Sequence, residues 1–335
     1  MVDIASYGVY VPRYRIKAEE INQAWGRSGG RGEKAVAAPD EDVLTMGVKA
    51  ARAALMRASL DGAQVEAVYF ASISSGYAEN ALAAQLAGLL GANQGVSVAD
   101  FGLSTRSVTS ALQACTDAME AGRIGCGLVI ASDRLIAKPG SDYELSYAAG
   151  AAALVLAKEG FASLGGFSAY SSGFVGRSRA EGQFHGTVDE RFVMQQGFLE
   201  HISLAIQDLT KVMNITLDQF GQVVLHAPDL RWGNRALAQI GLDPKKHVST
   251  FAQIGYAGCA SFLVDLAYAL EKLTSLRKIL AVSYGPGGSD ALALSVEKQP
   301  SKMHGLMTVE EQLNQKEHVS YSTYLRYSRL LGGPR

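Results

Sequence analysis

The chain has 335 residues, of which 48% are hydrophobic and 19% are charged. Its 31 Lys and Arg residues against 32 Asp and Glu residues give a formal net charge of −1, so no overall electrostatic field favours nucleic acid or an anionic membrane as a partner. This length and composition predict a globular protein with one large core or two half-sized cores.

The sequence shows no membrane span, export signal or metal-binding motif. The longest apolar run, YAAGAAALVLA (147–157), is too short for a bilayer, which needs about 20 residues. The N-terminal segment MVDIASYGVYVPRYR lacks the charged and apolar regions of a signal peptide. Three cysteines without CxxC spacing fit a reducing compartment and argue against a disulfide framework or structural zinc. We therefore expect a cytoplasmic protein with no metal site.

Strands alternate with helices along the first half of the chain. The hydrophobic period predicts a strand at 3–9, helices at 40–58 and 80–90, a helix within 100–133, and strands at 67–72, 127–131 and 149–156.

The second half repeats this pattern. QVVLHA (222–227) followed by NRALAQIGL resembles AVYFASI followed by NALAAQLAGLLG, and SDALALSV (289–296) matches AAGAAALVLA (148–157). TFAQIGYAGCASFLVDLAYALEKLTSLRKILAVSYG (250–285) matches DFGLSTRSVTSALQACTDAMEAGRIGCGLVIASD (100–133) block for block. We predict an internal duplication of a βαβαββ unit, with halves at 1–160 and 161–335.

The helix in each long repeat determines the predicted architecture. In the first, Val108, Ala111, Leu112, Cys115 and Met119 recur at helical spacing, and the other face is also mostly small or apolar. Such a helix should be buried nearly all round. Two of them require a sheet on each side, which gives a five-layered α/β stack. The loops at the strand ends of both halves then converge on one site.

Standard catalytic motifs are missing, which leaves one histidine as a candidate. The chain has no GxSxG, GxxxxGK[ST] or HExxH motif and no GxGxxG after a strand. Of six histidines only His226 ends an apolar strand, opposite the small polar residues at 104–107. A lone histidine there is often structural, but the duplication places it at the convergent site.

Three further segments have two interpretations each. The glycines of SYGPGGSDALAL (283–294), Gly287 among them, could let the backbone approach the buried helices or adopt positive φ, or could cradle a phosphate. Arg231 and Trp232 in HAPDLRWGNR could be an exposed pair that holds a phosphate and an adenine, or a solvated helix start. The tyrosine-rich tail VSYSTYLRYSRLLGGPR could bind a partner or pack on its own body. A fourth segment, 175–192, is expected to cover the site.

Together these residues resemble the thiolase superfamily, nearest to the 3-hydroxy-3-methylglutaryl-CoA (HMG-CoA) synthases and their ketoacyl synthase III relatives. The likeness covers nearly the whole chain and includes SYGVYVPRYRIKAEEI, KPGSDYELSYAAGAAALVLA, VVLHAP, ILAVSYGPGGSDALAL and YSTYLRYSR. The resemblance implies a five-layered αβαβα fold and a tunnel for a coenzyme A thioester, with no covalently bound cofactor. It also implies a homodimer formed through the strand beside the nucleophile helix.

The resemblance breaks at the catalytic residues. The family's nucleophilic cysteine begins the first buried helix, in a pattern like Phe-Ala-Cys-Lys-Ala-Gly-Thr, and Thr105 aligns with it, beside Ser104. The synthase glutamate falls on Ile73, and the asparagine of a second-half Asn-Thr-Tyr-Ser-Gly pattern falls on Ile254, or on Gln253 if the register slips by one.

Two family positions are retained. The family histidine aligns with His226, and Arg231 aligns with a basic residue that faces the CoA phosphates in relatives. A threonine hydroxyl is a poor substitute for a thiolate, because only the thiol has a pKa that its surroundings readily lower to physiological pH.

Three functions are therefore considered. The first is a catalytically degenerate synthase-like subunit that supports an active thiolase-type partner, together with a small zinc-ribbon/OB-fold protein, in an acyltransferase or thiolase complex. The second is a stand-alone acyltransferase or decarboxylase that uses His226 with Thr105 or Ser104 and no covalent intermediate. The third is a subunit that binds and delivers acyl-CoA.

Overall fold

Ten strands form one continuous sheet in the computed structural model, which describes residues 2–331 except 181, 187, 274–276 and 301–303. The strand order is β10-β9-β11-β12-β8-β1-β7-β6-β4-β5. These strands are β1 (Asp3–Tyr10), β4 (Ala67–Ala71), β5 (Ser97–Phe101), β6 (Cys126–Arg134), β7 (Ala149–Ala157), β8 (Ala162–Ser171), β9 (Phe220–Leu225), β10 (His247–Val248), β11 (Lys278–Gly285) and β12 (Gly288–Val296).

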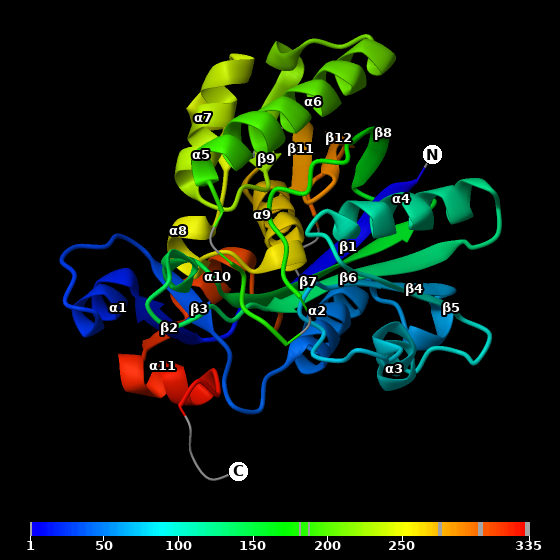
Figure 1. The fold of residues 1–335 in the computed structure, drawn as a ribbon. Helices are drawn as coiled ribbons and strands as arrows, with labels where there is room; N and C mark the ends of the chain where they lie inside the picture. Colours follow the sequence, from blue (N-terminus) through cyan, green and yellow to red (C-terminus); the bar gives the residue numbers. More distant parts are fainter. Residues whose placement is uncertain (1, 181, 187, 274–276, 301–303, 332–335) are drawn as a thin grey trace.

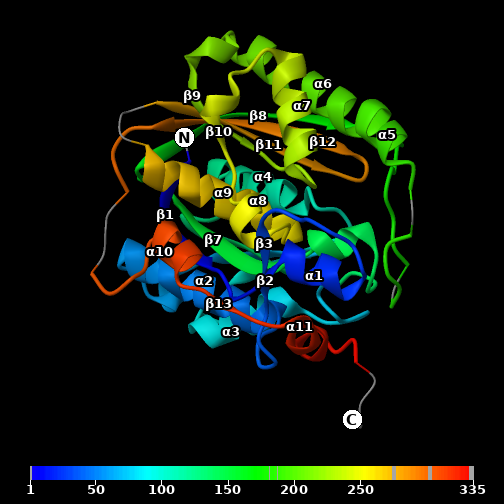
Figure 2. The same cartoon turned by 90° about the vertical axis from the view of Figure 1, so that its left-hand side faces the viewer.

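Helices lie on both faces of the two half-sheets, in five layers (Figures 1 and 2). The central layer is α4 (Ser107–Glu120) with α9 (Gly258–Lys272). The outer layers are α2 (Val43–Ala58) with α3 (Leu82–Leu90), and α6 (Glu200–Met213) with α7 (Leu230–Ile240). The shorter helices are α1 (Ala18–Ala24), α5 (Glu190–Phe192), α8 (Phe251–Ile254), α10 (Val309–Asn314) and α11 (Tyr321–Tyr327), and a π-helical segment, Val193–Leu199, joins α5 to α6.

The sheet order reads as two equivalent sets of five strands. The first half runs β1-α2-β4-α3-β5-α4-β6-β7 and the second runs β8-α6-β9-α7-β10-α9-β11-β12. The sets join only through β1 and β8, with Asp3 opposite Ser163 and Ile4 opposite Ala162. Each half thus contains one strand–helix step more than the predicted βαβαββ unit, because the short strands β5 and β10 carry no strong hydrophobic alternation.

The two central helices are not equally buried. Every residue of α9 from Gly258 to Leu270 is buried, as expected. In α4, however, Ser110 and Asp117 are exposed and Gln113 is half-buried. The expectation that α4 is buried nearly all round is therefore wrong, because these polar residues recur at i, i+3 and i+7 and form one solvent-facing stripe.

A second, three-stranded sheet holds the C-terminal segment against the first half. Its strands are β2 (Tyr14–Lys17), β3 (Glu33–Val36) and β13 (Glu317–His318), in the order β13-β2-β3. The tail helix α11 packs beside it, where Tyr324 is 4% exposed and Tyr327 contacts the ring of Tyr14 edge-on. These tyrosines of the tail therefore pack on the chain's own body, which is one of the two interpretations of that segment. In the described part of the chain no helix is long and apolar enough to cross a membrane.

A buried lysine joins this tail to the body. Lys34 is 1% exposed, and its Nζ donates to the carbonyl oxygen of Glu144 and, at 3.1 Å, to the hydroxyl of Tyr324. Burial lowers the pKa of Lys34 to about 7, although the charge of Glu144 acts in the opposite direction.

The Lys34→Met variant should therefore change how stability depends on pH. The unfolded chain binds its proton on Lys34 up to about pH 10.5, whereas the folded chain releases it near pH 7. The wild type should gain stability relative to the variant as pH rises through this window, by at most about 1.4 kcal/mol per pH unit. Urea midpoints at about pH 7 and about pH 9.5 test this. A difference between the two proteins that does not change with pH would contradict the assignment.

Candidate functional site

The mouth of α4 is fixed to the end of β11. The backbone enters through Leu103, which has φ = +70° and is 99% exposed. Thr105 Oγ1 then donates to the carbonyl oxygen of Tyr284 at 2.8 Å, and Ser104 Oγ donates to that of Pro286 at 3.0 Å. Both hydroxyls that the sequence placed at this mouth are thus engaged as donors to backbone.

The glycine-rich turn between β11 and β12 permits this close contact. A Cβ on Gly285 would lie 2.5 Å from Ser104 Oγ and 2.7 Å from Thr105 Oγ1. Gly287 and Gly288 have φ of +90° and +148°, which L side chains rarely adopt. The predicted backbone roles of these glycines are therefore confirmed. Gly287 itself does not line the cavity described next; its carbonyl accepts from Arg106.

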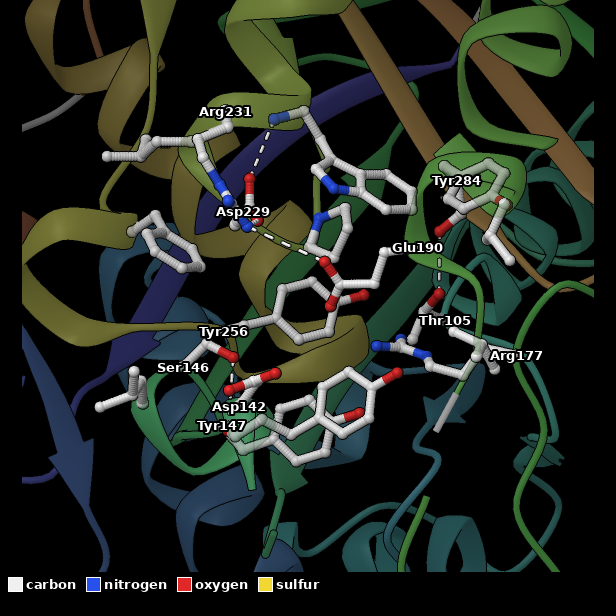
Figure 3. Close-up of a pocket in the computed structure, with 18 of the residues that line it drawn as sticks. Thr105, Asp142, Ser146, Tyr147, Arg177, Glu190, Asp229, Arg231, Tyr256 and Tyr284 are labelled. Atoms are coloured by element: carbon white, nitrogen blue, oxygen red, sulfur yellow. Dashed lines mark hydrogen bonds and ion pairs between the residues drawn. The ribbon is translucent and has the colours of Figure 1, made fainter. Parts of the chain in front are cut away.

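A cavity of about 790 Å³ opens at this mouth (Figure 3). Both halves contribute to its wall, as the converging loops predicted. The segment 175–192, expected to cover the site, supplies four of the lining residues. The wall is rich in aromatic rings and charged groups and includes Thr105, Tyr143, Tyr147, Tyr256, Tyr284, Phe251, Trp232, Arg31, Arg177, Arg231, Asp142, Glu190 and Asp229.

His226 lies behind this wall rather than in it. It is 2% exposed, and its ring stacks on that of Tyr256 with centroids 5.2 Å apart and an interplanar angle of 18°. Burial, together with the positive charge of Arg177, lowers the pKa of His226 to about 4. The imidazole is therefore neutral at pH 7, and Tyr256 is the residue that presents this part of the site to the cavity.

Arg231 and Trp232, predicted as a pair, lie in different environments in the structure. Trp232 is 8% exposed and packs edge-on against Phe198, so the expectation of an exposed pair fails for it. Asp229 caps α7 by accepting from the Trp232 amide at 2.9 Å, which turns Trp232 toward the core with Ala236. Arg231 is exposed, with Nη2 3.0 Å from Asp229 Oδ2 and 3.9 Å from Glu190 Oε2.

The two isoleucines aligned with polar family residues lie away from the cavity wall. Ile73 follows β4, and its amide donates to Asp133 at 2.8 Å. Ile254 is fully buried at the end of α8. Neither is among the residues that line the cavity.

All three cysteines are also outside the cavity wall. Burial raises the pKa of Cys115, inside α4, to about 12, and raises that of half-buried Cys126. Cys259, at the start of α9, lies closer, with Sγ 3.6 Å from the carbonyl oxygen of Ser104. Burial first, and then the neighbouring carboxylate of Asp133, raises its pKa. None of the three is poised as a thiolate.

Two of the most prominent site residues were not singled out from the sequence. Tyr256 was noted only as part of the IGYAG match, and Arg177 only as part of the segment expected to cover the site. The available signal was the position of Tyr256 just before a buried helix. Among the described residues no group of three or more His, Cys, Asp or Glu side chains could hold a metal ion.

Comparison with known proteins gives full-length relatives. A hydroxymethylglutaryl-CoA synthase of Methanopyrus kandleri is 32% identical over 342 residues, which cover 98% of this chain and 98% of that protein. A second, of Archaeoglobus fulgidus, is 31% identical and covers 98% and 99%. The chain belongs to the hydroxymethylglutaryl-CoA synthase family. No protein-family model matches it.

Solved structures of the thiolase superfamily share this fold. An HMG-CoA synthase complexed with CoA superposes with a TM-score of 0.86 at 20% identity, over 97% of this chain and 89% of that one. A 3-oxoacyl-[acyl-carrier-protein] synthase III from Aquifex aeolicus gives 0.79 at 17% identity, over 88% and 100%. The predicted thiolase-like α/β fold is thus confirmed for this HMG-CoA synthase homologue.

Proposed function

We propose that this chain is a catalytically degenerate HMG-CoA synthase-like subunit that supports an active thiolase-type partner in a multicomponent acyl-CoA acyltransferase or thiolase complex. The observation that carries the proposal is the threonine at the mouth of α4. Thr105 faces the cavity at the place where the family alignment puts the nucleophilic cysteine, and its hydroxyl donates to a backbone carbonyl.

Chemistry explains why this position matters. An acyl-enzyme forms when a nucleophile is ionised or has a base in contact with it. A thiol at a helix N-terminus meets the first condition, but a threonine hydroxyl does not. A base in contact with the hydroxyl also lacks support. Thr105 Oγ1 donates to the carbonyl oxygen of Tyr284, and the ring of Tyr256 lies over His226.

The other aligned positions agree with a loss of condensing activity. In the alignment on which the proposal rests, Ile73 takes the place of the glutamate, and Ile254 that of the asparagine, or Gln253 if the register slips by one. All three lie outside the cavity wall. With isoleucine at position 73, no carboxylate is available there to take the proton from the carbon atom that condenses. The stand-alone enzyme that uses His226 has less support, since this imidazole is buried and behind Tyr256.

The intact cavity supports a second role, in which the subunit binds or delivers an acyl-CoA. Relatives of the same fold are solved with CoA and with 3-hydroxy-3-methylglutaryl coenzyme A. A cavity of about 790 Å³ falls in the usual range for small-molecule sites, roughly 300–1,000 Å³. Arg231 and Arg31 lie on its wall as candidates for the CoA phosphates, although Arg231 would first have to leave Asp229 and Glu190.

The proposed partners are a thiolase-type catalytic subunit and a small zinc-ribbon/OB-fold protein, around a homodimer of this chain. The edge strand β5 is a suitable dimer surface, because it pairs only with β4 and Val98 on it is 40% exposed. An unpaired strand edge readily adds another strand. The tail is a weaker candidate than the sequence suggested, since Tyr324 and Tyr327 contact their own body.

Native mass spectrometry of the chain co-expressed with the products of neighbouring genes tests the proposal. We expect a complex that contains this chain and a thiolase-type subunit that keeps its own cysteine. A chain that remains partnerless in the presence of that subunit would contradict it.

A further inference from the structure

Arg177 is a cation inside the cavity, and no carboxylate of the described residues forms an ion pair with it. Its guanidinium points inward from the segment between β8 and α5, beside Tyr147 and Tyr256 (Figure 3), and it also lies over the ring of Tyr143. The guanidinium carbon lies 5.7–5.8 Å from each of the three ring centroids. Within the described part of the chain no carboxylate lies within ion-pair distance of it.

Two other arginines near the site are paired with carboxylates, whereas Arg31, also on the cavity wall, is exposed to solvent. Arg106 forms a bidentate pair with Asp290, and Arg231 pairs with Asp229 and Glu190. Asp142 and Glu190 share the cavity with Arg177 but lie beyond ion-pair distance of it. An arginine that is partly shielded from water, with tyrosine rings and hydroxyls but no carboxylate beside it, retains the capacity to bind an anion.

Neighbouring groups respond to this positive charge. Burial, and then the charges of Arg177 and Arg179, lower the pKa of His185 to about 3. Burial and the charge of Arg177 also lower the pKa of His226. Both imidazoles are therefore neutral, so the positive potential in this part of the cavity comes from arginine.

The position of Arg177 separates it from the residues suited to phosphates. Arg31 and Arg231 are exposed, at the rim of the cavity. Arg177 instead adjoins Tyr256, whose hydroxyl is within hydrogen-bonding reach of both Arg177 and Thr105. An anion on Arg177 would thus lie next to Thr105, where the acyl group of a bound thioester would end.

We propose that Arg177, with the hydroxyl of Tyr256, forms a carboxylate subsite, so that the cavity selects thioesters whose acyl group carries a second, free carboxylate. This inference rests on the proposed thioester binding. A guanidinium and a hydroxyl can together donate to both oxygens of a carboxylate. An acyl group that ends in a methyl would exclude water from Arg177 without supplying a counter-charge, which is unfavourable.

Calorimetric titration with succinyl-CoA and butyryl-CoA tests the subsite, because the two differ by a carboxylate in place of a methyl. We expect the wild type to bind succinyl-CoA at least tenfold more tightly, which corresponds to about 1.4 kcal/mol. Arg177→Gln should remove this preference, and Arg177→Lys should retain part of it. Arg31→Gln is the matched control. It should weaken the binding of both thioesters equally and keep the preference for succinyl-CoA.

The outcomes separate the two proposals. Equal binding of the two thioesters by the wild type would overturn the carboxylate subsite and leave thioester binding intact. No binding of either thioester would contradict thioester binding itself. Free succinate that binds as tightly as succinyl-CoA would contradict the thioester class. A preference that survives in Arg177→Gln, with an unchanged circular dichroism spectrum, would exclude Arg177 as its source.

Discussion

The Asp290→Ala variant should lose about 3–5 kcal/mol of unfolding free energy, because it leaves Arg106 without its buried counter-charge. Asp290 is fully buried and accepts from Arg106 Nε at 3.1 Å, from Arg106 Nη2 at 2.5 Å and from Thr109 Oγ1 at 2.5 Å. Arg106 occupies the N-cap position of α4, and its Nη1 donates to the carbonyl oxygen of Gly287 at 3.2 Å. The pair therefore fixes the mouth of α4 to β12. Urea unfolding at neutral pH measures the loss.

The double variant Arg106→Met/Asp290→Leu is the control for this prediction. Replacing both charges by apolar side chains removes the buried ion pair without leaving one charge alone, and such replacements are often neutral. The double variant should be more stable than Asp290→Ala. If the single variant stays within about 1 kcal/mol of the wild type, the pair does not hold α4 in this way.

The Thr105→Cys variant should acquire a reactive thiol. A cysteine at this position faces the cavity at the N-terminus of a 14-residue helix and near Arg177, and both features stabilise a thiolate. With iodoacetamide at neutral pH, intact-mass analysis should show one label on the variant before Cys115, Cys126 or Cys259 reacts. Thr105 is 2% exposed but lines the cavity, whereas these three cysteines lie outside the cavity wall and have raised pKa values.

The wild type and Thr105→Ser are the controls for the labelling. Both should remain unlabelled over the same period, because a hydroxyl does not react with iodoacetamide under these conditions. Rapid labelling of the wild type would mean that one of its natural cysteines is more accessible and more acidic than the structure indicates. It would then be the first candidate for a nucleophile.

The sequence predicted the architecture correctly in those segments where apolar residues recur at regular helical or strand spacing. The full burial of α9 and the pairing of the halves could be predicted from repeated apolar spacing. Strands β5 and β10 could not, since β5 is largely exposed and β10 has two residues. Ser110, Gln113 and Asp117 indicate the exposed stripe of α4, but three polar residues were too few to change the prediction of a buried helix based on its apolar face.

The site was harder to predict because it depends on contacts between distant segments. The helical spacing of Trp232 with Ala236 would have indicated a buried tryptophan, but only once Asp229 was recognised as the helix cap. Arg177 lies in a segment without period, so its tyrosine neighbours could not be deduced. The pairing of Lys34 with Tyr324 joins residues 290 positions apart, and no local pattern indicates it.

The most direct test of the account is the intact mass of each subunit after the purified assembly is incubated with acetyl-CoA or succinyl-CoA. The account predicts that this chain keeps its unmodified mass while the thiolase-type partner carries the acyl group on its own cysteine. A stable acyl adduct on this chain, mapped by peptide analysis to Thr105 or to any other residue lining the cavity, would contradict it.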